Sequence, residues 1–210
     1  VEGIVPEFLT LLHGVLDSPD IPLNVSRSSL QSDSNVKKIS SHILKKVSDK
    51  LDEIFRKERE EFEKKWNDIK IFIEYGIISE PDFYDKAIKF TLFKNLDNKY
   101  STLEEYKGLI SANQTDKDNN IVILYATDAD EQYSFIQSAK EVGYDVIILD
   151  EAIDGYFINA IEQKNEKVKF VRVDADVTSK LIDKGEDSPS KLSEKETEKV
   201  KGIFEGMVDK

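Results

Sequence analysis

The sequence predicts an α/β protein in which long helices, forming a helical coil, are followed by a small α-β-α unit with a three-stranded parallel sheet. Beyond residue 35, apolar residues recur at spacings of three and four, which is the period of an amphipathic helix. After residue 120, three short runs rich in β-branched residues alternate with helical patterns. The 210 residues are 39% hydrophobic and 34% charged, the balance of a globular protein that can bury a core.

The first long helix is predicted over residues 36–55, where the apolar positions share one face and most of the lysines lie away from it. The apolar positions are Val36, Ile39, Ile43, Val47, Leu51, Ile54 and Phe55. Residues 36–70 carry 11 basic and 8 acidic side chains, and this is the only net basic stretch when the chain is divided by composition. The helix is therefore expected to be amphipathic, with a solvated basic face.

Two further helices are predicted before residue 95. The apolar residues at 62, 66 and 69 continue a helical period after the charge-dense KEREEFEKKW stretch, and this pattern runs out near Gly76. A third helix is expected from Pro81 to Phe93, because proline at a first helical position costs no hydrogen bond. Ser79 can act as the cap ahead of it.

The second half of the chain is predicted to be a linker followed by alternating strands and helices. Residues 96–120 are polar and turn-rich, with one short helix in TLEEYKGLI, where Thr102 is the cap and Glu105 completes a capping box. The predicted strands are IVILYA (121–126), DVIILD (145–150) and KVKFVRV (167–173). They are expected to be parallel with right-handed crossovers, because parallel neighbours need a long return connection.

The composition excludes several classes of function. Thirty basic against 42 acidic residues give a net charge of −12, so no extended basic surface is available for nucleic acid or anionic lipid. The absence of cysteine removes thiolate nucleophiles and Cys-ligated zinc, and it fits a reducing compartment. His13 and His42 are the only histidines, which makes a histidine-rich metal site or a Ser/His/Asp hydrolase hard to build. No apolar run approaches the roughly twenty residues that span a bilayer.

Motifs for catalysis or cofactor binding are scarce. The nine glycines never form GxGxxG or GxxxxGK, so neither a dinucleotide fingerprint nor a phosphate loop is present. Two pairs of aspartates follow predicted strands, where α/β proteins sometimes hold Mg²⁺. These pairs are Asp128 with Asp130, and Asp174 with Asp176. We favour turn or helix-cap roles for them over a metal site.

Arg27 is the most unusual of the charged residues. The segment DSPDIPLNVSRSSLQ (17–31) offers Asn24 or Ser26 as a helix cap, which sets Arg27 at or before the first turn, where its charge opposes the helix dipole. An external anion is therefore a candidate partner for Arg27. From these residues alone, an ion pair with a nearby aspartate is the favoured explanation. The aspartates in question are Asp17, Asp20 and Asp33.

PLNVSR followed by LQ, and preceded by GVLDSPDI, closely resembles the middle-domain signature of the ninety-kilodalton heat-shock protein chaperones, their bacterial type in particular. The FEKKW stretch, the later βαβαβ pattern with YAT and AID, and the charged linker also occur in that family's order. The resemblance implies an ATP-dependent, dimeric, cytoplasmic chaperone with an N-terminal nucleotide-binding domain, a middle domain and a C-terminal dimerisation domain. It further implies partly folded client proteins as partners.

The resemblance also implies roles for three residues. Arg27 matches the middle-domain arginine that reaches the γ-phosphate of ATP held, with Mg²⁺, by the N-terminal domain. Asn24 and Gln31 match an asparagine and a glutamine of the same catalytic loop. A guanidinium delivered by another domain would offset charge on the phosphate oxygens in the transition state. The chain departs from the family pattern at His13, Ser28 and Gly155.

The resemblance divides the chain into four segments. Residues 1–35 are expected to end the larger middle-domain lobe with the catalytic arginine loop, and residues 36–95 to form a helical connecting segment. Residues 96–178 would be the small α/β subdomain, and residues 179–210 a charged linker with the first helix of the C-terminal domain. The chain begins with Val1 rather than Met, and we expect a fragment that is monomeric and catalytically silent alone.

Two alternatives of other classes remain open. One is a helical protein–protein interaction module with no part in ATP hydrolysis. The other is a small nucleotide-binding α/β domain that uses the turn after residues 121–126. For the aromatic residues that could contact clients, we favour packing between the helices, because their spacing is helical. These aromatics are Trp66, Phe72 and Phe83.

Overall fold

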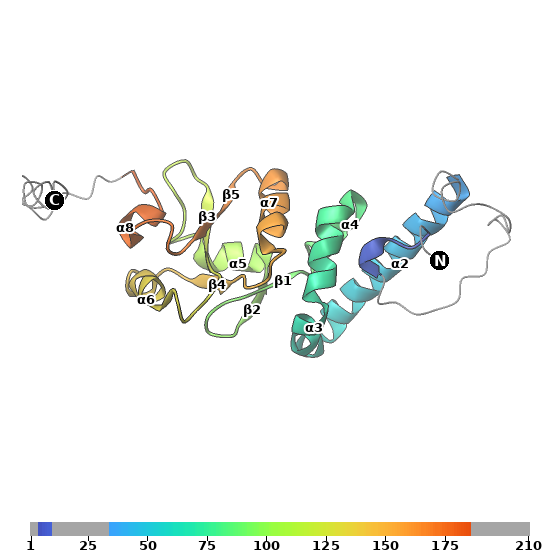
Figure 1. The fold of residues 1–210 in the computed structure, drawn as a ribbon, viewed down its shortest axis with the longest axis horizontal. Coiled ribbons are helices and arrows are strands. Elements are labelled where there is room, and N and C mark those ends of the chain that lie inside the picture. Colours follow the sequence, from blue (N-terminus) through green and yellow to red (C-terminus); the bar gives the residue numbers. More distant parts are fainter. Residues whose placement is uncertain (1–3, 10–33, 186–210) are drawn as a thin grey trace, which may run out of the picture.

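A computed structural model describes residues 4–9 and 34–185 of the chain. Helices gather at one end of the molecule and an α/β unit lies at the other (Figure 1). The helical end consists of the 3₁₀ turn η1 (Glu7–Leu9), α2 (Ser34–Lys57), α3 (Arg59–Ser79) and α4 (Pro81–Ala87). The α/β end consists of β1 (Leu92–Lys94), β2 (Tyr100–Thr102), α5 (Leu103–Ile110), β3 (Ile121–Ala126), α6 (Tyr133–Glu141), β4 (Val146–Ile148), α7 (Asp154–Lys164), β5 (Val168–Arg172) and α8 (Thr178–Leu181).

The predicted long helix is confirmed as α2, which covers the whole apolar stripe and ends at Lys57. A single residue, Glu58, separates it from α3, which continues three residues past Gly76. Arg59, the first residue of α3, connects this break to the α/β unit. Its guanidinium lies 4.6 Å from the centroid of the Phe55 ring and donates to both carboxylate oxygens of Glu105, at 3.1 and 3.0 Å. The break between the two helices is therefore tied to the start of α5.

The third helix is shorter than predicted. Pro81 is its first residue, as expected, but the cap is Glu80, while the Ser79 hydroxyl donates to the Tyr75 carbonyl within α3. The helix ends at Ala87 instead of Phe93, and the Thr91 hydroxyl donates 2.8 Å to the Ala87 carbonyl. The residues beyond it are buried on several sides and leave no solvent face for a helix. They are Phe90, Leu92 and Phe93.

Residues 92–102 form an antiparallel hairpin that was not predicted from the sequence. β1 pairs with β2, with Phe93 opposite Ser101. The connecting turn is held by the Asn95 side chain, whose Oδ1 accepts from the backbone amides of Asp97 and Lys99, each at 3.0 Å. The expected linker at 96–120 therefore contains a strand as well as its helix. The predicted capping box of that helix, α5, is confirmed, because Thr102 and Glu105 bond reciprocally.

The predicted parallel sheet is confirmed, with the strand order β4-β3-β5. Alternate residues of β3 face opposite sides, as expected for a central strand. Ile123 faces the core shared with α5 and α7, whereas Val122 and Leu124 face the core shared with α6 and α8. The sheet is therefore the middle layer of an α-β-α unit.

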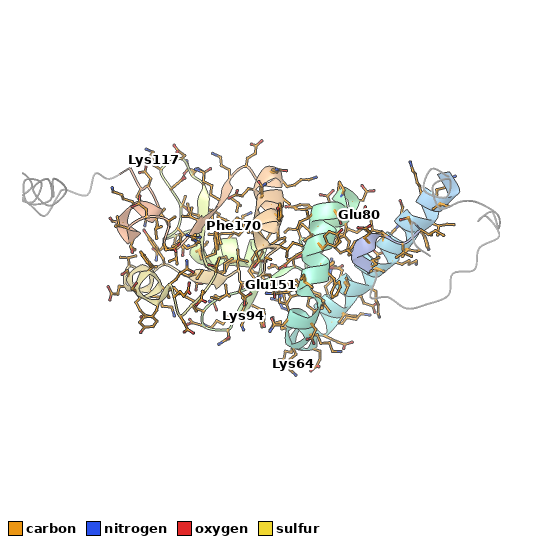
Figure 2. All side chains as sticks on the ribbon, in the orientation of Figure 1. Lys64, Glu80, Lys94, Lys117, Glu151 and Phe170 are labelled. Atoms are coloured by element: carbon orange, nitrogen blue, oxygen red, sulfur yellow. The ribbon has the colours of Figure 1, made fainter. Side chains whose placement is uncertain are left out.

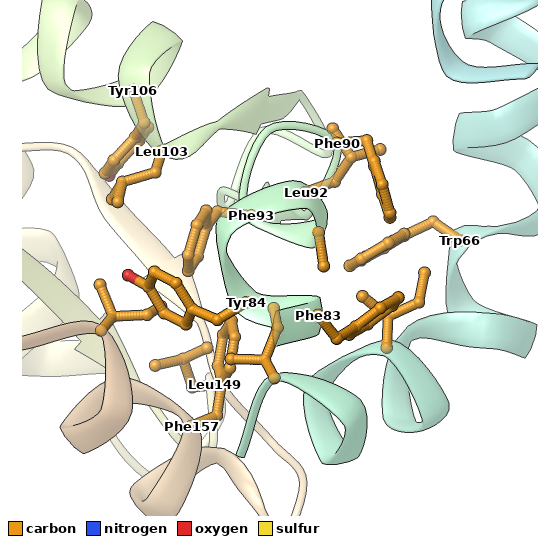
Figure 3. Packing of buried hydrophobic residues seen from close by; sticks show 14 of the residues in the cluster. Trp66, Phe83, Tyr84, Phe90, Leu92, Phe93, Leu103, Tyr106, Leu149 and Phe157 are labelled. Carbon is orange, nitrogen blue, oxygen red and sulfur yellow. The ribbon is translucent and has the colours of Figure 1, made fainter. Parts of the chain in front are cut away.

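The helical end and the α/β unit share one continuous core. Side chains fill the space between them, with Glu80 at the start of α4 and Phe170 inside the α/β unit (Figure 2). Trp66 meets Phe90 and Leu92 on the helical side, and the packing continues to Phe93 and Phe157 (Figure 3). Phe93 stacks on Phe157 with ring centroids 5.8 Å apart. Trp66 and Phe83 are thus core residues, which confirms their packing interpretation.

Candidate functional site

The three residues that the resemblance assigns to the nucleotide, Asn24, Arg27 and Gln31, lie outside the described residues. The described segments that flank them are both anchored. On one side, Phe8 of η1 packs against Phe83, with ring centroids 4.6 Å apart. The hydroxyl of Tyr75 in α3 also donates 2.9 Å to the carboxylate of Glu7. On the other side, Val36 in the first turn of α2 is buried.

The aspartates that follow the strands form turns. The Asp128 carboxylate accepts from the backbone amides of Asp130 and Glu131, at 2.9 and 3.0 Å. Asp174 pairs with Arg172, and Asp176 accepts from the amide of Val177 at 2.7 Å. Within residues 4–9 and 34–185, no group of three His, Cys, Asp or Glu residues could hold a metal ion. The turn interpretation of these aspartates rests on the turns themselves and on the hydrogen bonds of Asp128 and Asp176.

Four backbone amides of the turn after β3 are already engaged in hydrogen bonds. The buried side chain of Gln132 accepts from the amides of Thr127 and Asp128, at 2.8 and 3.1 Å. The amides of Asp130 and Glu131 donate to the Asp128 carboxylate. A phosphate-binding turn needs free amides that point at its ligand. This geometry counts against the alternative of a nucleotide site after residues 121–126.

A charged cluster instead lies where α3 meets the loop between β4 and α7. Lys70 and Glu74 come from α3, and Asp150, Glu151 and Asp154 come from the loop and the first turn of α7. All five line a pocket of about 470 Å³, whose lining also includes Trp66, Leu92, Phe93 and Leu149. Figure 2 labels Glu151 and Lys94 at this junction.

Lys70 is the cation at the centre of the cluster. Its ammonium lies 2.9 Å from Asp150 Oδ1 and 3.4 Å from Glu151 Oε1, and its side chain is 15% exposed. Burial lowers the pKa of Lys70, but the bond to Asp150 and the surrounding carboxylates outweigh burial and hold its pKa above the ordinary value. The same bond overcomes burial at Asp150 and lowers the pKa of that carboxyl. Lys70 and Asp150 are therefore both charged at neutral pH.

Glu74 and Asp154 are the buried acids of the cluster, each 4% exposed. Burial, followed by the negative charge of Asp154, raises the pKa of Glu74 to about 8, although Lys70 opposes this change. Burial also raises the pKa of Asp154, whose Oδ2 accepts 2.8 Å from the Glu151 amide at the start of α7. Glu74 Oε2 and Asp154 Oδ1 are buried without a hydrogen-bond partner among the described residues.

This cluster is not among the sites predicted from the sequence. One signal was present: Glu74 interrupts the apolar stretch IFIEYGII and lies one turn after Lys70, on the face of α3 that carries Trp66, Ile73 and Ile77. An acid at a core-facing helical position predicts a partner or a shifted pKa. Its neighbour Asp154 is 80 residues away, and only the tertiary packing of α3 on α7 brings the two together.

Comparison with known proteins identifies the family. A family model described as Hsp90 protein matches residues 1–210, the whole chain. The chain belongs to the Hsp90 family. Two relatives are the chaperone protein HtpG of Bacteroides fragilis, 56% identical over 210 residues, and that of Porphyromonas gingivalis, 53% identical over 208 residues. These alignments cover 100% and 99% of this chain, but only 31% and 30% of the relatives.

A solved structure also resembles this Hsp90-family chain. It is the middle domain of a Plasmodium falciparum heat shock protein, with a TM-score of 0.55 and 14% sequence identity. The match covers 69% of this chain and 60% of that structure. At this identity the likeness concerns the fold, which is thus that of a heat shock protein middle domain. In the described part of the Hsp90-family chain, no helix has the length and apolar character needed to cross a bilayer.

Proposed function

We propose that this chain is the later part of the middle domain of an ATP-dependent, dimeric chaperone, and that Arg27 reaches the γ-phosphate of ATP. The motif PLNVSR (22–27) is the observation that carries the proposal. Membership of the Hsp90 family and the middle-domain fold support it. The nucleotide and its Mg²⁺ would be held by an N-terminal domain of the complete protein, and Asn24 and Gln31 would shape the approach to it.

The role proposed for Arg27 is electrostatic. A guanidinium presents several N–H donors in a planar fork that matches phosphate oxygens, and it stays protonated at any physiological pH. Placed at the γ-phosphate, it would stabilise the charge that spreads over the oxygens during hydrolysis. Since the arginine and the nucleotide would belong to different domains, hydrolysis would depend on their docking.

The anchored flanks are consistent with such a loop. η1 is fixed to α3 and α4 through Phe8, and α2 begins with the buried Val36. A catalytic side chain on a loop needs a rigid scaffold at both ends, because small displacements weaken a charge contact. We also propose the four-segment division, with its boundaries near residues 35, 95 and 178. Client proteins, homodimerisation through a C-terminal domain and a cytoplasmic location complete the proposal.

The test is single-turnover ATP hydrolysis by the complete protein carrying Arg27→Ala. We expect the rate to fall roughly ten- to a thousandfold, the effect of losing one charge-stabilising donor, with nucleotide affinity nearly unchanged. Arg56→Ala is the matched control, because Arg56 is an exposed arginine of α2 that pairs with Asp52 at 3.0 Å. This control should hydrolyse ATP at the wild-type rate.

The outcomes separate the proposal from its alternatives. A rate within twofold of wild type for Arg27→Ala would contradict the role of Arg27 and favour the helical interaction module. Nucleotide binding by the 210-residue chain alone would instead favour a nucleotide site of its own. Arg27→Lys adds a further distinction, because it keeps the charge and loses the planar fork. A partial recovery of the rate would show that the charge itself contributes.

A further inference from the structure

The cluster between α3 and α7 has more negative than positive groups. Four carboxylates line the pocket: Glu74, Asp150, Glu151 and Asp154. Lys70 is the cation among them, and its ammonium contacts Asp150 and Glu151. Lys94 of β1 lies on the pocket wall and makes no ion pair with the residues described here. The two buried acids are thus left without a cation of their own.

The buried oxygens also lack hydrogen-bond donors. Glu74 accepts no hydrogen bond from the described residues, and Asp154 uses only Oδ2, so Glu74 Oε2 and Asp154 Oδ1 are without partners. Both side chains are 4% exposed. Buried carboxylates without donors are costly, so each such oxygen in a native structure calls for an explanation. Because the two acids come from different elements and line one pocket, a single ligand could serve both.

The groups that line the pocket favour a nitrogen cation over a metal ion as its ligand. Divalent Mg²⁺ or Ca²⁺ takes six or more oxygen ligands, whereas no group of three acidic or histidine residues in the described part of the chain could hold a metal. A guanidinium is planar, weakly hydrated and able to donate to two carboxylates at once. Trp66 and Phe93 line this pocket and are each 2% exposed, so they form an apolar wall beside the acids.

We propose that the pocket between α3 and α7 binds a guanidinium group, which donates to Glu74 and Asp154 beside the wall that includes Trp66. The volume of about 470 Å³ admits a guanidinium with a short alkyl stem but not a folded segment. The ligand is therefore an arginine side chain on a protein partner or a free guanidinium compound. When the guanidinium binds, Glu74 Oε2 and Asp154 Oδ1 must turn toward the pocket.

The protonation of Glu74 gives this binding a distinctive pH dependence. Because the pKa of Glu74 is about 8, the carboxyl is mostly protonated at pH 7 and mostly ionised at pH 9. A cation that binds the ionised form releases the proton, so affinity should rise about eight- to tenfold between pH 7 and pH 9. The other charged groups that face Glu74 are Lys70 of α3, Lys94 of β1, and Asp150, Glu151 and Asp154 of the loop and α7.

The sole tryptophan of the chain, Trp66, provides the measurement. Titration of the protein with propylguanidinium at constant ionic strength should change its fluorescence with a dissociation constant of about 1 mM at pH 9. Glu74→Gln keeps the shape and removes the charge, so it should weaken binding at least tenfold and abolish the pH dependence. Asp68→Asn is the control, because Asp68 is exposed on α3 outside the pocket and its loss should change nothing.

Three further ligands complete the test. A short alanine-based peptide with one internal arginine distinguishes an arginine side chain from a free guanidinium compound. If both the peptide and propylguanidinium bind, the site is assigned to a protein side chain. If propylguanidinium alone binds, the site is assigned to a free compound. Propylammonium that binds equally well would overturn the preference for a guanidinium. Ca²⁺ that displaces propylguanidinium would show a metal site instead. Absence of saturation, or equal binding by Glu74→Gln, would overturn the proposal altogether.

Discussion

Replacing Glu74 by glutamine should stabilise the protein increasingly as the pH rises. Glu74 is 4% exposed and has a pKa of about 8 in the folded protein, against an ordinary value of 4.5. The folded state therefore holds a proton that the unfolded state has lost between these two values. The contribution of Glu74 to the free energy of unfolding is fully present below about pH 4.5. It falls as the pH rises to about 8 and then stays constant. Glutamine cannot ionise, so the variant avoids this loss.

The size of the effect follows from the same two pKa values. Each unit of difference corresponds to about 1.4 kcal/mol, so the window from 4.5 to about 8 gives an upper bound of about 5 kcal/mol. The opposing effect of the Lys70 ammonium is already contained in the pKa of about 8, so it does not lower this bound further. Glutamine also removes the repulsion between Glu74 and Asp154, and its side-chain amide can donate to the unpartnered oxygen of Asp154.

Urea unfolding followed by Trp66 fluorescence at pH 5, 7 and 9 measures this gain. The midpoint of Glu74→Gln should lie close to that of the wild type at pH 5 and well above it at pH 9. Glu141→Gln is the control, because Glu141 is an exposed acid at the end of α6, and its midpoint should follow the wild type at every pH. A constant difference between Glu74→Gln and the wild type from pH 5 to pH 9 would refute the reasoning.

Substitutions at three further positions test the packing and the local signals, each followed by thermal unfolding. In Gly76→Ala the new Cβ would lie 2.8 Å from ring carbons of Phe8 and of Phe83, so unfolding should become easier by about 1–2 kcal/mol despite the better helix propensity of alanine. At Gly108 no atom lies within 4 Å of an added Cβ. Gly108→Ala should therefore stabilise α5 by up to about 1 kcal/mol, measured by thermal unfolding. Thr102→Ala should cost about 1 kcal/mol by removing the capping box, and Thr102→Ser should restore most of it.

The parts of the fold that could be predicted are those that local sequence determines. β3 begins and ends where the IVILYA run does, because six consecutive apolar residues suit a strand covered on both faces. α2 follows from the period of its apolar stripe, and the start of α5 follows from the reciprocal bonds that Thr102 and Glu105 make over three residues. Each of these signals lies within one element.

The parts that could not be predicted depend on packing between distant segments. The apolar residues at 88–93 fit a helical period, yet they leave α4 and enter β1 because the core between α3 and the sheet surrounds them. The hairpin turn also depends on Asn95, which bonds its own loop and donates 3.0 Å to Asp145 beside β4. The pocket between α3 and α7 is of the same kind, since Glu74 and Asp154 meet only after both helices have packed.

The continuous core has a consequence for how the segments move. Phe8 of η1 packs on Phe83, and Phe83 belongs to the same buried cluster as Phe157 of α7. Close-packed cores resist gradual deformation, so a displacement of η1 should carry α3, α4 and the α/β unit with it as one body. The junction of α3 with α7 is the exception within this core, because Glu74 Oε2 and Asp154 Oδ1 are buried there without a hydrogen-bond partner among the described residues. A change of charge there, by a proton or a bound cation, would act first on the packing of α3 on α7.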